Sequence, residues 1–300
     1  MSEKESKRAW FAPTDLASWE MSLMRLLFVL IVFAIIPTAS SLTSQPNPVG
    51  IAHFVDLTFL AKPGVLSGIR IALIPVAICY VIGFLPVATR LLLLLGTVLP
   101  GTLDNSQGST QHSLQVISLI LLAQLSCAIW FKLRKGHRKE ARLWDVFASQ
   151  QAIVAAYVVT AITKISVSGV GWIIHSKNFP IQMQKNLQMA YYNTLEYPTK
   201  QPGFWASWPD KVQTLFLESP NLCRVMLTSG LALELFAILA LLGKRWAAAY
   251  GALLILFHLL VRAMTGLNFR FHMSVLFIFL VLPFLLGFVS KIIEKRKLAA

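Results

Sequence analysis

The stretch YVVTAITKISVSGVGWII, from Tyr157 to Ile174, decides how this chain is interpreted. It is apolar enough to lie in hydrocarbon, yet it carries one lysine, Lys164, well inside it. An ammonium group in a membrane helix costs about 2.5–3.5 kcal/mol, so such a residue usually faces a partner or a wet cavity. Two later apolar runs contain candidate partners, Glu234 and His258. Our hypothesis is that the amine, the carboxylate and the imidazole converge on one pocket inside a membrane.

The composition of the whole chain is that of a membrane protein. Hydrophobic residues make up 56% of the 300 residues and charged residues only 13%. Several runs approach the roughly 20 apolar residues that span a bilayer. The sequence therefore predicts an all-α fold, a polytopic integral membrane bundle of about eight transmembrane helices with one amphipathic external segment. The predicted spans are 19–39, 69–85, 89–99, 112–131, 144–174, 225–242, 246–267 and 272–293.

Three features of these spans call for a physical explanation. The span 89–99 is short for a bilayer and is followed by a polar loop, Pro100 to Gln111, so it should be tilted or re-entrant. The run that ends at Ile174 exceeds one bilayer thickness, so it should tilt or project. Arg25 lies inside the first span, where it is expected to snorkel to the interface or to pair with Glu20.

The spans form a single predicted transmembrane domain over residues 19–293. Residues 1–18 are a cytoplasmic leader, which is too acidic and too far from the first apolar run for a cleaved signal peptide. Residues 294–300 are a cytoplasmic tail. Residues 175–224 are an extramembrane, amphipathic segment rich in aromatic residues and proline, a composition that suits a cap over a membrane cavity.

The net charge of +14 is concentrated in short segments between and beyond the apolar runs. An excess of Lys and Arg marks the cytoplasmic side of a membrane protein. Eight crossings place the basic segments inside and the sparsely charged loops outside, which predicts an integral protein of the plasma membrane with both termini cytoplasmic. The expected partner is the lipid bilayer, and no nucleic acid is expected. The basic segments are Lys4–Arg8, Lys132–Arg142, Lys244–Arg245 and Lys291–Lys297.

Lys164, Glu234 and His258 are the candidate catalytic residues. A lysine in a low-dielectric environment can lose its proton and act as a base, whereas a neighbouring carboxylate keeps it charged. The alternative is a Lys–Glu or His–Glu pair that only ties helices together. Both interpretations remain open from the residues alone.

Further polar residues are expected near the outer ends of the spans. Arg262 is four residues from His258 and shares its helix face, and Arg270 and His272 follow. These residues could bind an anionic substrate, or they could contact lipid phosphates. His112 opens the fourth span and either joins the same vestibule or caps its helix.

The sequence contains none of the common metal or nucleotide motifs. There is no His-Glu-x-x-His, no Cys-x-x-Cys and no phosphate-binding Gly-Lys-Ser/Thr loop. The three cysteines, Cys79, Cys127 and Cys223, are far apart and have no metal-ligand spacing. No metal site and no nucleotide-driven chemistry are expected.

Three segments resemble the membrane domain shared by vitamin K-dependent gamma-carboxylases and their bacterial relatives, the HTTM family. FAPTDLASWEMSLMRLLFVL, residues 11–30, is similar to that family's opening into a span with an early arginine. YVVTAITKISVSGVGW, residues 157–172, resembles its Tyr-…-Lys-Leu-…-Trp segment. Residues 231–273 resemble its acidic span, basic turn and Phe-His segment.

The resemblance implies roles for individual residues. Lys164 takes the position of the base toward a vitamin K hydroquinone, Glu234 matches an acidic position, and His258 matches the family histidine. Trp172 matches the family tryptophan but lies further along the chain than the family pattern has it. A quinone-like, lipid-soluble cofactor is implied, with Trp172, Arg262 and His112 as the candidate cofactor-binding residues.

Two departures from the family change the expected activity. The acidic residues that follow the lysine in carboxylases are replaced here by ISVSGVG, residues 165–171. The large extramembrane portion that engages the carboxylated protein has no counterpart, so gamma-carboxylation of a protein is not expected. Two functions remain: a membrane enzyme acting on a quinol with Lys164 as base, or a non-catalytic membrane partner in the maturation or export of a secreted peptide. A small-solute transporter is less consistent, because no internal repeat is evident.

Overall fold

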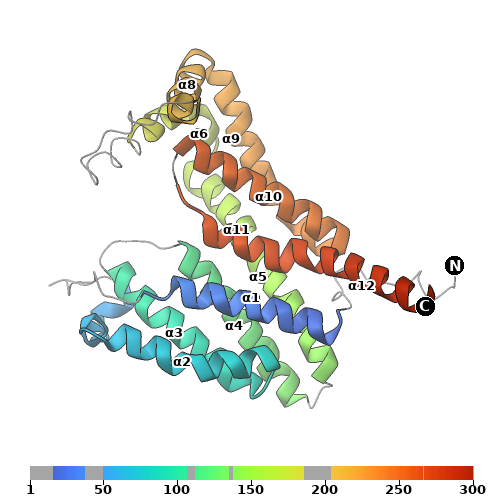
Figure 1. Cartoon of the computed structure of the whole chain (residues 1–300). Coiled ribbons are helices and arrows are strands. Elements are labelled where there is room, and N and C mark those ends of the chain that lie inside the picture. The colour runs from blue at the N-terminus through green and yellow to red at the C-terminus, as the bar shows by residue number, and fades with distance from the viewer. Residues whose placement is uncertain are drawn as a thin grey trace.

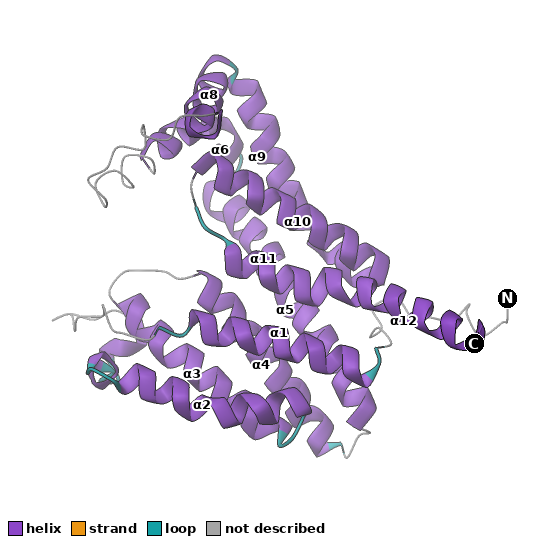
Figure 2. Cartoon of the chain, viewed as in Figure 1, coloured by secondary structure: helices purple, strands orange, loops and turns teal. Residues whose placement is uncertain are grey.

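The computed structural model describes residues 16–37, 50–106, 112–134, 138–185, 204–265 and 267–299, and within these ranges it contains helices and no strands (Figure 2). Eight segments are long and apolar enough to cross a membrane, so the predicted all-α, multi-pass membrane bundle is confirmed. The spanning helices are α1 (Ser18–Ile35), α2 (Val65–Ile82), α3 (Pro86–Ser106), α4 (His112–Leu133), α5 (Arg138–Ser168), α9 (Pro220–Leu235) with its 3₁₀ extension η6 (Phe236–Leu242), α10 (Lys244–Thr265), and α11 (Arg270–Leu276) continuing through η7 (Phe277–Val281) into α12 (Leu282–Ala299).

Helix α5 lies between two groups of helices and contacts both. It packs against α4 on one side and against α9 and η6 on the other (Figure 1). Helices α2 and α3 extend the first group beyond α4, and α10 extends the second beyond η6. Residues carried by α5 can therefore reach partners in either half of the bundle.

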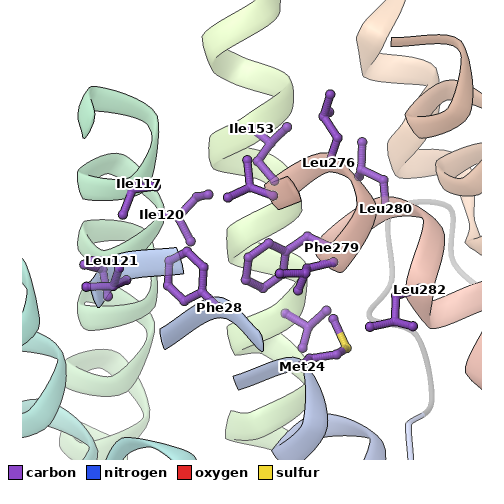
Figure 3. Close-up of a cluster of buried hydrophobic side chains, with 14 of the residues drawn as sticks. Met24, Phe28, Ile117, Ile120, Leu121, Ile153, Leu276, Phe279, Leu280 and Leu282 are labelled. Atoms are coloured by element: carbon purple, nitrogen blue, oxygen red, sulfur yellow. The ribbon is translucent and has the colours of Figure 1, made fainter. Parts of the chain in front are cut away.

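The core joins α1, α4 and α5 to the last span, as Figure 3 shows. The ring of Phe28 meets that of Phe279 edge to face at 5.2 Å, and Ile120 and Ile153 are fully buried beside them. Since lipid is as apolar as these side chains, close packing holds such helices together. Helix α2 instead carries an exposed apolar stripe that suits contact with lipid. The stripe is formed, at helical spacing, by Ile71, Ile74, Ile78 and Ile82.

The last span contains a local irregularity that a proline explains. Residues Phe277–Val281 wind as a π-helix just before Pro283. The α-helical partner of the Phe279 carbonyl would be the N–H of residue 283, which proline lacks. Instead, the buried side chain of Gln150 on α5 donates a 2.8 Å hydrogen bond to this carbonyl. The α5–last span contact thus satisfies a backbone group that would otherwise be unpaired in hydrocarbon.

Two predicted boundaries are wrong. Helix α3 does not end at Leu99 but runs through Pro100 to Ser106, so it is neither short nor followed directly by a loop. Proline removes only one backbone hydrogen bond, and the burial of Leu103 against Leu60 and Leu66 stabilises the added turns.

The long apolar run ending at Ile174 is also interrupted. Helix α5 ends at Ser168, because Gly169 adopts a left-handed backbone with φ +54°. A short helix α6 (Gly171–Ile174) and a 3₁₀ turn η4 (His175–Asn178) follow. The run therefore bends at a glycine where the sequence predicted tilting or projection.

The segment after the fifth span folds against the ends of the bundle. Residues 179–185 are helical, and α8 (Phe204–Glu218) follows. Met183 and Phe216 pack with Cys223 of α9 and Met264 of α10 in a small separate core. The sixth span begins at Pro220, slightly before the predicted Val225. The leader, apart from residues 16–18, lies outside the described residues.

Candidate functional site

Lys164 of α5 and Glu234 of α9 form a two-point ion pair. The Lys164 ammonium donates to both carboxylate oxygens, with Nζ–O distances of 2.6 and 2.8 Å. The Glu234 side chain is 7% exposed and that of Lys164 is 25% exposed. The two charges predicted to seek partners inside the membrane thus satisfy one another. Trp172 of α6 lies near the same ammonium, with the Nζ 5.3 Å from its ring centroid.

His258 of α10 pairs with a residue to which the sequence assigned no role, Tyr157. The Tyr157 hydroxyl lies 2.6 Å from Nε2 of His258, and both side chains are buried. Tyr157 and Lys164 are seven residues apart, two turns along one face of α5. That spacing was readable in the sequence, but nothing in it indicated that the hydroxyl would meet an imidazole.

The second ring nitrogen of His258 has no hydrogen-bond partner among the described residues. Nδ1 is buried and makes no hydrogen bond to any described residue. Phe269 lies across the ring at a centroid distance of 4.7 Å, and the ring of His272 is 5.8 Å away. A buried polar atom without a partner is costly, and it commonly marks a bound water or ligand.

The two pairs are close enough to influence each other. Tyr157 is within electrostatic reach of Glu234, and His258 is within reach of Lys164.

Gly251, two turns before His258, allows α10 to pack closely against the last span. A Cβ added at Gly251 would approach the Cβ of Leu280 to 2.8 Å. A larger residue there would push α10, and His258 with it, away from the last span.

The remaining predicted polar residues differ in burial and in how they are placed relative to His258. Arg262 is exposed although His258, four residues earlier, is buried, so the two do not share one environment. His112 is exposed at the start of α4, with Nδ1 3.4 Å from the Gln115 side-chain oxygen. His272 is buried, and its Nδ1 lies 2.9 Å from the hydroxyl of Ser113 on α4. His272 thus lies beside the site, since its ring is 5.8 Å from that of His258.

A second buried polar cluster lies toward the opposite end of the bundle. Asp145 of α5 accepts hydrogen bonds from Arg25 of α1 at 3.0 Å and from Arg90 of α3, the latter through two nitrogens. Both guanidinium groups also lie over the ring of Tyr80. The three ionised groups carry a net charge of +1 inside the protein.

This cluster corrects the prediction for Arg25. Arg25 neither snorkels nor pairs with Glu20, because Asp145 offers a buried carboxylate. Glu20 instead accepts from the backbone N–H of Ala17 and from the hydroxyl of Ser290. The sequence analysis assigned no role to Asp145, which follows the basic segment at the start of α5.

The described residues contain no group of three or more His, Cys, Asp or Glu side chains that could hold a metal ion. Comparison with known proteins adds no assignment: no family model, no curated protein and no solved structure matches this chain.

Proposed function

We propose that this multi-pass membrane protein binds a quinone-like, lipid-soluble molecule beside His258 and transfers a proton to or from it. The observation that carries the proposal is the buried Nδ1 of His258, which makes no hydrogen bond within the part of the chain that the structure describes. It lies within electrostatic reach of a lysine–carboxylate pair, in a bundle with eight candidate membrane spans. The resemblance to the HTTM family favours the same class of molecule.

The chemistry of His258 suits such a molecule in either tautomer. If the Tyr157 hydroxyl donates to Nε2, the proton of His258 is on Nδ1, which can donate to a carbonyl oxygen. If Nε2 carries the proton, Nδ1 can accept from a hydroxyl. A quinone presents carbonyl oxygens and a quinol presents hydroxyls, so one nitrogen can bind both forms.

Lys164 can act as a base only after it gives a proton to its partner. In the ion pair, Nζ holds three protons and has no lone pair. Transfer of one proton to the Glu234 carboxylate leaves a neutral amine and a neutral carboxylic acid, and a low-dielectric environment favours neutral forms. The amine can then accept the hydroxyl proton of a quinol, and a charged ammonium and a quinol anion result.

The non-catalytic alternative is supported by the same ion pair. Two hydrogen bonds between Lys164 and Glu234 connect α5 to α9, and such a pair can be purely structural. In that case the chain would serve as a membrane partner of a secreted peptide or protein, with residues 175–224 as the contact segment. The two functions differ in whether the site recognises a small molecule.

Equilibrium binding of 2-methyl-1,4-naphthoquinone to the purified full chain tests the proposal. His258→Phe keeps an aromatic ring against Phe269 but removes both nitrogens, and we expect at least tenfold weaker binding. Leu260→Phe, two residues along the same helix and on its exposed side, is the matched control and should bind within twofold of wild type. Equal binding by His258→Phe and wild type would refute the site.

The proposed location is the plasma membrane, with both termini cytoplasmic. The support is the arrangement of charge. If successive helices cross the membrane in alternating directions, the end of α4 and the start of α10 lie on the same side, and both carry basic residues. The first of these segments holds Lys132 and Arg134, and the second holds Lys244 and Arg245.

A further inference from the structure

The surface between α4 and α5 is hollowed into a groove of about 900 Å³. Its walls hold small and apolar side chains, among them Ala123 and Ala148, and Cys127 lies part of the way along. At one end stand Trp130, Arg134, Glu140 and Trp144. The groove is therefore mostly apolar along its length, with Ser126 and Gln151 as its polar residues there, and it is charged and aromatic at one mouth.

The length of the groove matches one leaflet of a bilayer. Ala123 and Arg134 are eleven residues apart on α4, which corresponds to about 16 Å at 1.5 Å per residue. Half of a hydrocarbon core roughly 30 Å thick is about 15 Å. An acyl chain that lies along the groove would thus have its polar end beside Arg134.

The mouth of the groove has the chemistry of a phosphate site at the membrane surface. The Arg134 guanidinium lies 4.0 Å from the centroid of the Trp130 ring, a contact that places it at the rim of the groove. Tryptophan favours headgroup depth, and arginine binds phosphate oxygens through its planar fork. Residues 132–142 include six Lys or Arg and one acidic residue, so the mouth attracts anions.

A second source of positive charge lies behind the groove wall. Cys127, which lines the groove, is within electrostatic reach of Arg90 and Asp145. These residues belong to the buried cluster of two arginines and one carboxylate, whose net charge is positive. The buried cluster therefore adds positive charge behind the part of the groove wall that Cys127 forms.

We propose that the α4–α5 groove is a binding site for one anionic phospholipid of the cytoplasmic leaflet, with its phosphate on Arg134 and an acyl chain between α4 and α5. The site is separate from the Lys164–Glu234 and Tyr157–His258 pairs. It does not depend on the function proposed for them.

Native mass spectrometry of the purified full chain tests this site. The protein in detergent is mixed with equal amounts of two lipids that have the same palmitoyl-oleoyl chains, a phosphatidylglycerol and a phosphatidylcholine. The detergent is then removed in the gas phase. We expect wild type to retain one phosphatidylglycerol, at least tenfold more often than phosphatidylcholine. Arg134→Gln should reduce this retention at least tenfold, and Ala148→Phe, which fills the groove without changing a charge, should do the same.

Arg245→Gln is the matched control, because Arg245 is an exposed arginine followed by an exposed tryptophan at the start of α10. Its lipid retention should stay within twofold of wild type. Equal retention of the two lipids by wild type would overturn the proposal, as would unchanged retention in both groove variants. A dimer that is lost in Ala148→Phe would assign the groove to a second copy of the chain and would equally overturn it.

Discussion

At the scale of single residues, the ion pair of Lys164 and Glu234 shows how a membrane bundle can hold two charges. Removing one partner of a buried pair leaves the other uncompensated and typically costs 3–5 kcal/mol. Lys164 is a quarter exposed, so we expect about 2 kcal/mol for Glu234→Gln. The double variant Lys164→Met/Glu234→Leu removes both charges and should regain most of that loss.

Thermal unfolding of the purified variants in one detergent measures this difference. The double variant also separates the two functions proposed for the site. If the pair is only structural, a stable double variant should keep every activity of the chain. A double variant that melts like Glu234→Gln would show that the two residues do not compensate each other.

A second prediction at this scale concerns Asp145. This carboxylate is the ionic partner of both Arg25 and Arg90, and all three side chains are buried. Asp145→Asn removes the only negative charge of that cluster and should cost at least about 3 kcal/mol. We expect a large fall in melting temperature, whereas Asp56→Asn, at an exposed turn, should change it little. A normal melting temperature for Asp145→Asn would mean that the guanidinium groups find other acceptors.

At the scale of elements, the contact between α5 and the last span can be tested through Pro283. Gln150→Leu keeps the side-chain size but removes the donor to the Phe279 carbonyl, which should cost about 1–3 kcal/mol. Pro283→Ala supplies the missing N–H, so Gln150→Leu should cost less in that background. Melting curves of the two single variants and the double variant measure the coupling. Strict additivity would show that Gln150 and Pro283 act independently.

The helices themselves could be predicted from the sequence, because apolar runs of membrane length are long and distinctive. Their ends were less certain: Pro100 resembles a stop signal but lies inside α3, and Gly169 breaks α5 within an apolar run. Lys164 and Glu234 were found because a charge is conspicuous among apolar neighbours. Tyr157 and Asp145 were missed as site residues, since their partners depend on how each helix is rotated, and packing sets that rotation.

At the scale of the whole molecule, the proposed orientation in the membrane is supported by eight candidate spans and by the positions of the basic segments. The segments at Lys132–Arg142, Lys244–Arg245 and Lys291–Lys297 all fall on one side if the described spans alternate in direction. Lys and Arg near span ends favour the cytoplasm. A green fluorescent protein fused to the C-terminus of the full chain should therefore fluoresce, whereas alkaline phosphatase at the same position should be inactive.

A reporter between α3 and α4 supplies the control for this prediction. A phosphatase inserted at 107–111, on the opposite side of α4 from Lys132–Arg142, should be active. The reverse pattern at the C-terminus would invert the molecule and place the mouth of the α4–α5 groove in the outer leaflet. Activity at both positions would contradict the described bundle, because it requires an even number of crossings between them. The chain makes five crossings there, through α4, α5, α9 with η6, α10 and the last span.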